Sequence, residues 1–216
     1  MIDASPYPRL FEPFTLAGKR LRNRIVHLSV TTASSQGRRP TPRHPQYFAN
    51  RAQGGAAMII TEPVNMAPHQ RVAGKVDAVS DADIDELKRW AEAVETHDCR
   101  LLAQVQDAGR GRHAAGRNME AVGAAPLPDD ISWTMPRVLS VPEIAEMLEG
   151  FASASLRLKG CGFSGVEISG GHGHLFHQFM SPWSNSREDR YGGDFEGRMR
   201  LMVEMVQQIR AACGSD

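Results

Sequence analysis

Residues 165–182 read GVEISGGHGHLFHQFMSP. A short β-prone run, GVEIS, is followed at once by glycines and by three histidines within six positions, His172, His174 and His177. An abrupt change from an apolar run to a glycine-rich polar segment predicts a strand that ends in a loop with chemically active side chains. The same succession of apolar run and polar loop occurs earlier in the chain, and this repetition decides the fold.

Four β-prone runs alternate with helical patterns along the chain. The β-prone runs lie at 25–30, 56–61, 100–106 and 165–169. The helical patterns lie at 43–53, from Ser80 and Asp81 onward, from a capping box at Ser140–Glu143 to Gly160, and from Glu196 to Gly214. Strands that alternate with helices of this size predict a parallel sheet covered by helices. The helical stripes predict these core residues: Ile84, Leu87, Ala91, Val94, Ile144, Met147, Leu148, Phe151, Ser155, Leu158, Met202, Met205, Val206 and Ile209.

The loops indicate which parallel fold this is. Segments 62–79, 107–139 and 170–195 are long and polar and follow the strands, whereas the connections before the strands are short. Long loops at the carboxyl ends of the strands are typical of a (β/α)₈ barrel. The first run is followed by VTTASSQG, which lacks the G-x-G-x-x-G of a dinucleotide-binding Rossmann domain. We therefore predict an α/β fold in which residues 1–216 form one domain, four βα units that make the N-terminal half of a TIM (β/α)₈ barrel.

Composition narrows the class of protein. The 216 residues contain 25 Lys and Arg and 25 Asp and Glu, a balance that draws the chain neither to nucleic acid nor to an anionic membrane. The three cysteines are odd in number and far apart, which favours a reducing compartment over a disulfide scaffold. The N-terminus lacks a hydrophobic signal core, and no run approaches the roughly 20 apolar residues of a membrane span. We expect a cytoplasmic protein.

The histidine cluster allows three interpretations: a metal site, one wall of an organic-cofactor pocket, or loop packing. Imidazole is a common zinc ligand, and Glu62, Asp107 or His113 could converge on the cluster in three dimensions. However, glycines interrupt the run, so the rings of His172 and His174 need not share a face, and no carboxylate or cysteine stands nearby at ligand spacing. We therefore predict no metal site.

Residues 162–200 resemble the densest motif of the old yellow enzyme family of FMN-dependent oxidoreductases. They follow that family's Gly-Val-Glu-Ile, its Gly-His-Gly turn, Gln-Phe-x-Ser-Pro, Asn-x-Arg-x-Asp-x-Tyr-Gly-Gly and a helix start with paired arginines. LFEPFTLAGKRLRNRIV at 10–26 resembles the family's opening hairpin, at about 10–22, and its first strand. GGAAMIITE at 54–62 and LLAQVQDAGR at 101–110 resemble the second and third strands.

The resemblance implies a non-covalent FMN across the carboxyl-end mouth of the barrel, with NADH or NADPH as reductant and a small molecule with an activated C=C bond as substrate. Carried over position by position, the cofactor-binding residues are Ser29, Val30, Thr31, Pro63 and Gln104, and the catalytic residues are His172 and His174. Gln104 would hydrogen-bond the pyrimidine ring, because an amide both donates and accepts. His172 would donate to a substrate carbonyl oxygen, and His174 is the candidate acid.

Five positions depart from the family's pattern or mark a subgroup. Ser169 stands where a substrate-binding histidine or tyrosine is common, and His174 stands where a proton-donating tyrosine is common. The unperturbed pKa of imidazole, about 6.5, still allows proton donation. Pro63 has no N–H to offer the flavin, and Asp107 replaces a histidine or similar residue. Thr31 stands where covalent-flavin relatives carry cysteine, which is why we expect non-covalent FMN.

Outside these positions, charged and aromatic residues have more than one interpretation. Arg187, Asp189, Glu196, Arg198 and Arg200 are dense enough to look catalytic, but we expect charge pairs that anchor a loop. Trp133 and Trp183 could stack on flavin or substrate, or form a hydrophobic lid. Arg110 and Arg112 are expected to be solvated.

A half-barrel has two open sheet edges, so we expect either a longer protein or pairing with a second half-barrel, its own copy or another chain. We expect the chain alone to bind FMN weakly and to dimerise or aggregate. Two alternative functions stay open: a larger flavoenzyme of the amine dehydrogenase or dienoyl-CoA reductase type, and a non-catalytic half-barrel partner.

Overall fold

The computed structural model describes residues 6–67, 74–111 and 120–214. Their centre is a four-stranded parallel sheet in the order β3-β4-β5-β8, formed by Val26–His27, Met58–Val64, Arg100–Val105 and Gly165–Ile168. Strands that are consecutive in this order follow one another along the chain, and a helix lies in each connection between them. This is the βα succession predicted from the sequence, with the carboxyl ends of all four strands at one end of the sheet.

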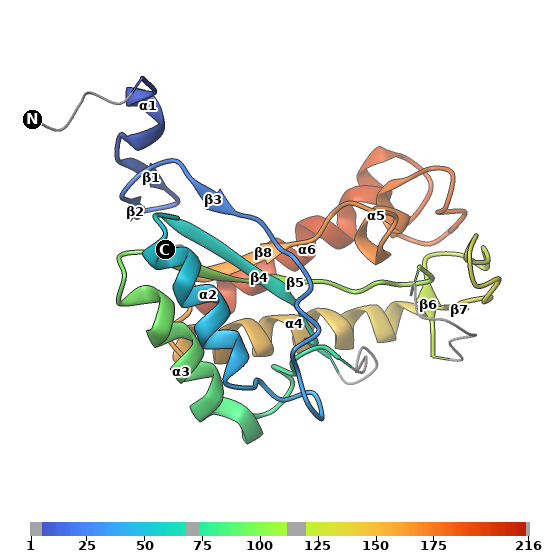
Figure 1. Cartoon of the computed structure of the whole chain (residues 1–216). Coiled ribbons are helices and arrows are strands. Elements are labelled where there is room, and N and C mark those ends of the chain that lie inside the picture. The colour runs from blue at the N-terminus through green and yellow to red at the C-terminus, as the bar shows by residue number, and fades with distance from the viewer. Residues whose placement is uncertain (1–5, 68–73, 112–119, 215–216) are drawn as a thin grey trace, which may run out of the picture.

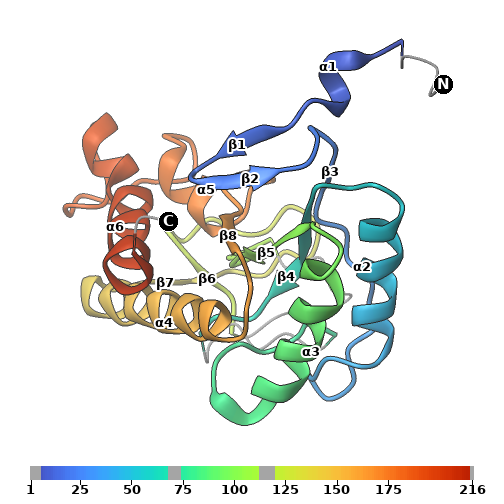
Figure 2. The same ribbon diagram turned by 90° about the vertical axis from the view of Figure 1, so that its left-hand side faces the viewer.

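Four long helices cover one side of the sheet. They are α2 (Arg43–Gln53), α3 (Ile84–Glu95), which follows the 3₁₀ turn η2 (Asp81–Asp83), α4 (Val141–Gly160) and α6 (Phe195–Cys213). Figure 2 shows them in an arc around the sheet, with the hairpin β1 (Phe14–Leu16) and β2 (Lys19–Leu21) on the other side. The hairpin turns through Ala17 and Gly18, which both have positive φ, as a two-residue turn between twisted strands requires.

Local signals set the ends of the helices. Ser140 accepts a hydrogen bond from the Glu143 backbone, while the Glu143 carboxylate accepts from the Ser140 backbone, so the predicted capping box is present at the start of α4. Helix α6 ends at Gly214, whose φ of 89° favours glycine. Helix α2 has the predicted bounds.

The strands differ from their predicted ranges. Strand β3 covers only two residues of the 25–30 run, because its ladder with β4 ends at the pair His27 and Ile59. Beyond it, Leu28 and Val30 are 66% and 52% exposed. Strand β4 continues to Val64, past the predicted end at residue 61, and all seven of its side chains are buried, as expected of an internal parallel strand.

The core lies between the sheet and the helices. The predicted positions of α3 and α4 are buried except Ile84, which is partly buried. Val206 of α6 was predicted in the core but is 38% exposed. It lines an apolar cavity of about 460 Å³ between α6, the outer strand β8 and the hairpin, where Leu16, Leu102 and Ile168 are among the lining residues.

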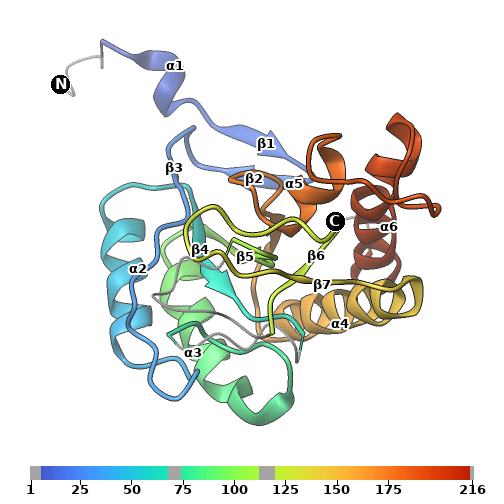
Figure 3. The same ribbon diagram turned by 90° about the vertical axis from the view of Figure 1, so that its right-hand side faces the viewer.

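Smaller elements gather beyond the carboxyl ends of the sheet. Helix α5 (Leu175–Met180) and the parallel pair β6 (Val122–Gly123) and β7 (Arg137–Val138) lie there, while α1 (Pro8–Phe11) lies near the hairpin (Figures 1 and 3). No helix among residues 6–67, 74–111 and 120–214 is long and apolar enough to cross a membrane.

Candidate active site

A bulge in β4 decides which side chains face the inner side of the sheet, away from the helices. Ile60 pairs with Leu102 and Pro63 pairs with Gln104, so β4 contains one residue more than β5 between these two pairs. An extra residue reverses the facing of every side chain that follows it. Pro63 therefore lies on the inner side beside Gln104, whereas Glu62 points to the helix side and contacts His44 of α2.

The inner side of the sheet carries a polar layer near its carboxyl end. The Gln104 amide nitrogen donates to the Glu167 carboxylate of β8 over 3.1 Å. One step further along the strands, the Lys75 ammonium donates to the Gln106 amide oxygen over 2.9 Å, and the Gln106 amide nitrogen lies 3.4 Å from the Ser169 hydroxyl. These side chains place amide, carboxylate and hydroxyl groups on the inner side of the sheet, at the carboxyl ends of β5 and β8.

The histidine bend follows β8. His172 is exposed and has a φ of 60°, a conformation that histidine adopts more readily than most residues. His174 is 9% exposed and caps α5, because its backbone oxygen accepts from the Gln178 backbone over 2.8 Å. The two rings are 6.0 Å apart between centroids. His177 has a local role, since its Nδ1 accepts from the Gly173 backbone over 3.0 Å.

Asp107 ties the loop after β5 to this bend. Its carboxylate accepts from the Gly109 backbone over 2.7 Å, and its backbone oxygen accepts from Leu175 at the start of α5 over 2.9 Å. Asp107 is 1% exposed. The departure from the family at this position therefore places a turn-forming carboxylate where it holds two loops together.

The metal interpretation of the histidine bend gains no support from the described residues. Among residues 6–67, 74–111 and 120–214, no group of three or more His, Cys, Asp or Glu side chains is placed to hold a metal ion. Glu62 is engaged by His44 and Thr32, and Asp107 is engaged by the turn that it forms. His113 and Arg112 lie outside the described residues.

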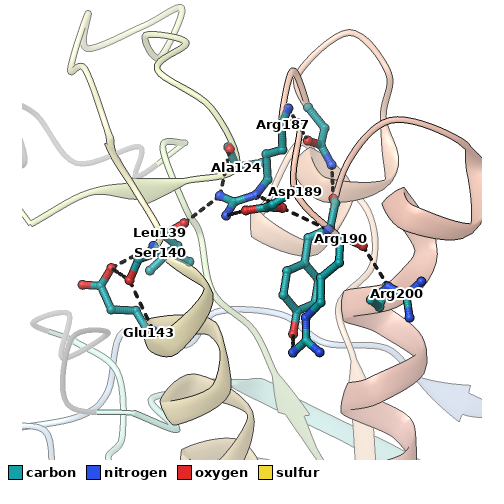
Figure 4. Close-up of polar contacts among 10 residues, drawn as sticks. Ala124, Leu139, Ser140, Glu143, Arg187, Asp189, Arg190 and Arg200 are labelled. Atoms are coloured by element: carbon teal, nitrogen blue, oxygen red, sulfur yellow. Dashed lines mark hydrogen bonds and ion pairs between the residues drawn. The ribbon is translucent and has the colours of Figure 1, made fainter.

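The charged segment after α5 anchors loops (Figure 4): the predicted charge pairing forms between Arg187 and Asp189, whereas Arg198 and Arg200 donate to backbone oxygens. The Arg187 guanidinium makes two hydrogen bonds to the Asp189 carboxylate, of 3.0 and 2.5 Å, and reaches the backbone oxygens of Ala124 and Leu139 over 3.2 and 2.6 Å. Its side chain is 6% exposed. The hydrogen bonds from Arg187 hold the pKa of Asp189 below its usual range, against the effect of partial burial. Arg200 donates to the Arg190 backbone oxygen over 2.8 Å.

The two tryptophans are exposed. Trp133 is 75% exposed with a φ of 54°, and Trp183 is 67% exposed beneath the Arg110 guanidinium, 5.0 Å from the ring centroid. Arg110 is not solvated as expected: its side chain is 11% exposed and donates to the Pro128 backbone oxygen. The guanidinium therefore links the segments that carry the two indoles.

Sequence reasoning placed Ser29, Val30, Thr31, Pro63, Gln104 and His172 at the ends of four separate strands, and the strand order brings these ends side by side. It did not identify Lys75, Gln106 or Glu167 as part of the polar layer. The alternation in β5 and β8 could have indicated Gln106 and Glu167, since they share a face with Gln104. No local signal indicated that Lys75 belongs to this layer, because it lies in the loop between β4 and η2.

Comparison with known proteins gives one family over nearly the whole chain. The model of the NADH:flavin oxidoreductase / NADH oxidase family matches residues 9–216. A metal reductase of Desulforamulus reducens is 35% identical over 207 residues, which are 96% of this chain and 31% of that protein. An NADPH dehydrogenase of Bacillus licheniformis is 32% identical over 205 residues, 94% of this chain and 60% of that protein.

A solved structure agrees in fold. Morphinone reductase in complex with tetrahydroNAD superposes with a TM-score of 0.88 at 27% identity, covering 96% of this chain and 61% of the other. The chain thus spans between about a third and three-fifths of the length of these relatives.

Proposed function

Because the chain belongs to the NADH:flavin oxidoreductase / NADH oxidase family, we propose that it supplies the N-terminal half of an FMN-dependent, ene-reductase-like barrel. The family resemblance, the barrel fold and FMN as the family's cofactor, all predicted from the sequence, are confirmed by the matches. The activity, substrate and partners of the whole protein are our proposals, since the chain spans only part of each relative.

The observation that supports this function best is the convergence of the candidate residues at one end of the sheet. That end of the sheet offers the Gln104 amide, the exposed apolar side chains of Leu28 and Val30, and the exposed His172. An amide edge beside apolar surface fits a flat heterocycle that has both donors and acceptors. We propose that Ser29, Val30, Thr31, Pro63 and Gln104 contact FMN.

When bound, FMN would supply the redox chemistry, the transfer of a hydride from NADH or NADPH to an activated C=C bond. His172 is proposed to donate a hydrogen bond to the carbonyl oxygen of the substrate, where negative charge develops as the hydride adds. Its exposed ring and its place next to the strand end support this role. Gln104 is proposed to orient the ring system from the inner side, held by its bond to Glu167.

His174 is proposed as the residue that returns a proton to the reduced substrate. His174 is 9% exposed and its ring lies next to that of His172, so it can act only on a group that enters the space beside the bend. Burial also means that its orientation is set by the protein, which favours directed proton transfer.

We also propose a second part of the barrel as partner, either further chain or another half-barrel. Strand β8 is at the edge of the sheet, and the apolar cavity beside it gives a continuing strand and helix a surface to cover. A cytoplasmic location belongs to this proposal, because the three cysteines are free thiols and reduced nicotinamide is the expected electron donor.

The function is tested with the protein purified together with the rest of its barrel. NADH- or NADPH-driven reduction of an enone is expected, and His172→Ala should lower kcat/KM at least tenfold while FMN stays bound. His177→Ala is the matched control, since His177 is an exposed histidine of the same bend with a local hydrogen bond. A complete assembly that never contains flavin would instead favour a non-catalytic half-barrel.

A second candidate is a larger flavoenzyme of the amine dehydrogenase or dienoyl-CoA reductase type. The observation that favours it is the similarity to the metal reductase of Desulforamulus reducens, of which this chain covers only 31%. Reduction of the bound flavin by an amine, or reoxidation of the reduced flavin by a dienoyl-CoA, would distinguish this type from an ene-reductase.

A further inference from the structure

The segment between β3 and Thr32 carries three of the proposed flavin contacts, yet the sheet does not hold it. The ladder between β3 and β4 ends at His27 and Ile59, before Ser29. The next firm attachment is Thr32, whose backbone N–H donates to the Glu62 carboxylate over 2.6 Å and whose hydroxyl donates to the same group over 2.9 Å. The position of residues 28–31 therefore depends on how Glu62 is held.

His44 holds Glu62 from the other side. Its Nδ1 accepts the backbone N–H of Thr41 over 3.0 Å, so the ring proton is on Nε2. Nε2 then donates to the Glu62 carboxylate over 2.7 Å. His44 is 0% exposed and Glu62 is 1% exposed, so water contributes little to this contact.

The carboxylate of Glu62 is charged in this setting. Burial acts to raise the pKa of Glu62, but the hydrogen bonds from His44 and Thr32 outweigh it, and the pKa lies below its usual value. Three donors converge on one buried anion: His44 Nε2–H, Thr32 N–H and Thr32 O–H. Loss of any one donor leaves a buried charge less well satisfied, which makes the arrangement stiff.

We propose that Glu62 and His44 are positioning residues that fix the flavin-lining segment Ser29–Thr31 through Thr32. The bulge in β4 makes this possible, because it turns Glu62 toward α2 while Pro63 stays on the inner side. The inference rests on the proposed function, since it concerns residues expected to contact FMN. It assigns neither Glu62 nor His44 a contact with cofactor or substrate.

The test compares Glu62→Gln with Glu95→Gln. Glutamine has one acceptor oxygen and an NH₂ group in place of the second oxygen. At position 62 this NH₂ group would therefore point at one or more of the three donors, which would lose their acceptor. Glu95 is a chemically matched control, because its carboxylate also accepts a backbone N–H, from Leu101 over 2.7 Å, and a hydroxyl, from Ser164 over 2.7 Å. Glu95 is the last residue of α3, and its hydrogen bond from Leu101 places its carboxylate at the amino end of β5, opposite the proposed mouth.

In the FMN-loaded protein with its complete barrel, Glu62→Gln is expected to raise the Kd for FMN about tenfold or more, and Glu95→Gln less than twofold. In the same protein without FMN, amide hydrogen exchange of residues 28–36 should speed up in Glu62→Gln only. An unchanged Kd in Glu62→Gln, or an equal rise in both variants, would overturn the inference. If the wild-type protein binds no FMN, the proposed function fails instead, while the exchange experiment still tests whether Glu62 holds the segment.

Discussion

Replacement of Arg187 by alanine should destabilise the fold more than any other single change in the charged segment after α5. The guanidinium is 6% exposed and makes four hydrogen bonds, two to Asp189 and two to backbone oxygens of the loop region around β6 and β7. In the variant, both backbone oxygens lose a charged donor and Asp189 loses its counterion.

The magnitude follows from these contacts. Breaking a buried ion pair from one side costs about 3–5 kcal/mol. The Asp189 side chain is 35% exposed, so water recovers part of its loss and the ion pair alone falls below that range. Each deprived backbone oxygen adds about 1 kcal/mol. A loss of about 3 kcal/mol in the free energy of unfolding is therefore expected.

Urea denaturation followed by circular dichroism measures this loss, with Arg89→Ala as the control. Arg89 also pairs with a carboxylate, Glu86, but its side chain is 66% exposed, and removal should cost at most about 0.5 kcal/mol. If Arg187→Ala loses less than about 1 kcal/mol at an unchanged m value, the loop is not anchored as the contacts indicate.

Three further predictions concern pH, assembly and the cysteines. The pKa of Asp189 is lowered in the folded state, so its stabilisation is present above its unfolded pKa of about 3.9 and is lost as pH falls through the folded value. The difference in stability between the wild type and Arg187→Ala should therefore shrink as the pH falls below about 4, to the share of the two backbone hydrogen bonds, which do not titrate; a difference that keeps its neutral-pH size would contradict this. The isolated chain should bind FMN weakly and dimerise or aggregate, as flavin fluorescence and size-exclusion mass can show; a yellow stoichiometric monomer would refute this. Burial raises the pKa of Cys99 to about 12, so a thiol reagent at pH 8 should modify Cys213, which is partly buried, well before Cys99, and equal rates would contradict the packing.

The helices were predictable because their signals are local. The capping box at Ser140 and Glu143 and the glycine at 214 lie within a few residues of the ends that they set. Helix α5 escaped prediction because its six residues are too few to show a period.

The ends of the strands and the inner face of the site depend on contacts between distant residues, and these could not be predicted. Strict alternation along β4 would put the Glu62 side chain on the same side of the sheet as Met58 and Ile60, but the bulge puts it on the opposite side. The bond between Gln104 and Glu167 joins residues 63 positions apart. For the same reason, the family resemblance could place Gln104 and His172 at one mouth, but not show what holds them.

The most direct test of the central claim, that the histidine bend and Gln104 face a flavin, is the composition of the native complete assembly. A visible spectrum of oxidised flavin with one FMN per site is expected, together with weakened FMN binding in Gln104→Ala. A colourless preparation that contains stoichiometric zinc, lost on replacement of His172 and His174, would contradict the claim.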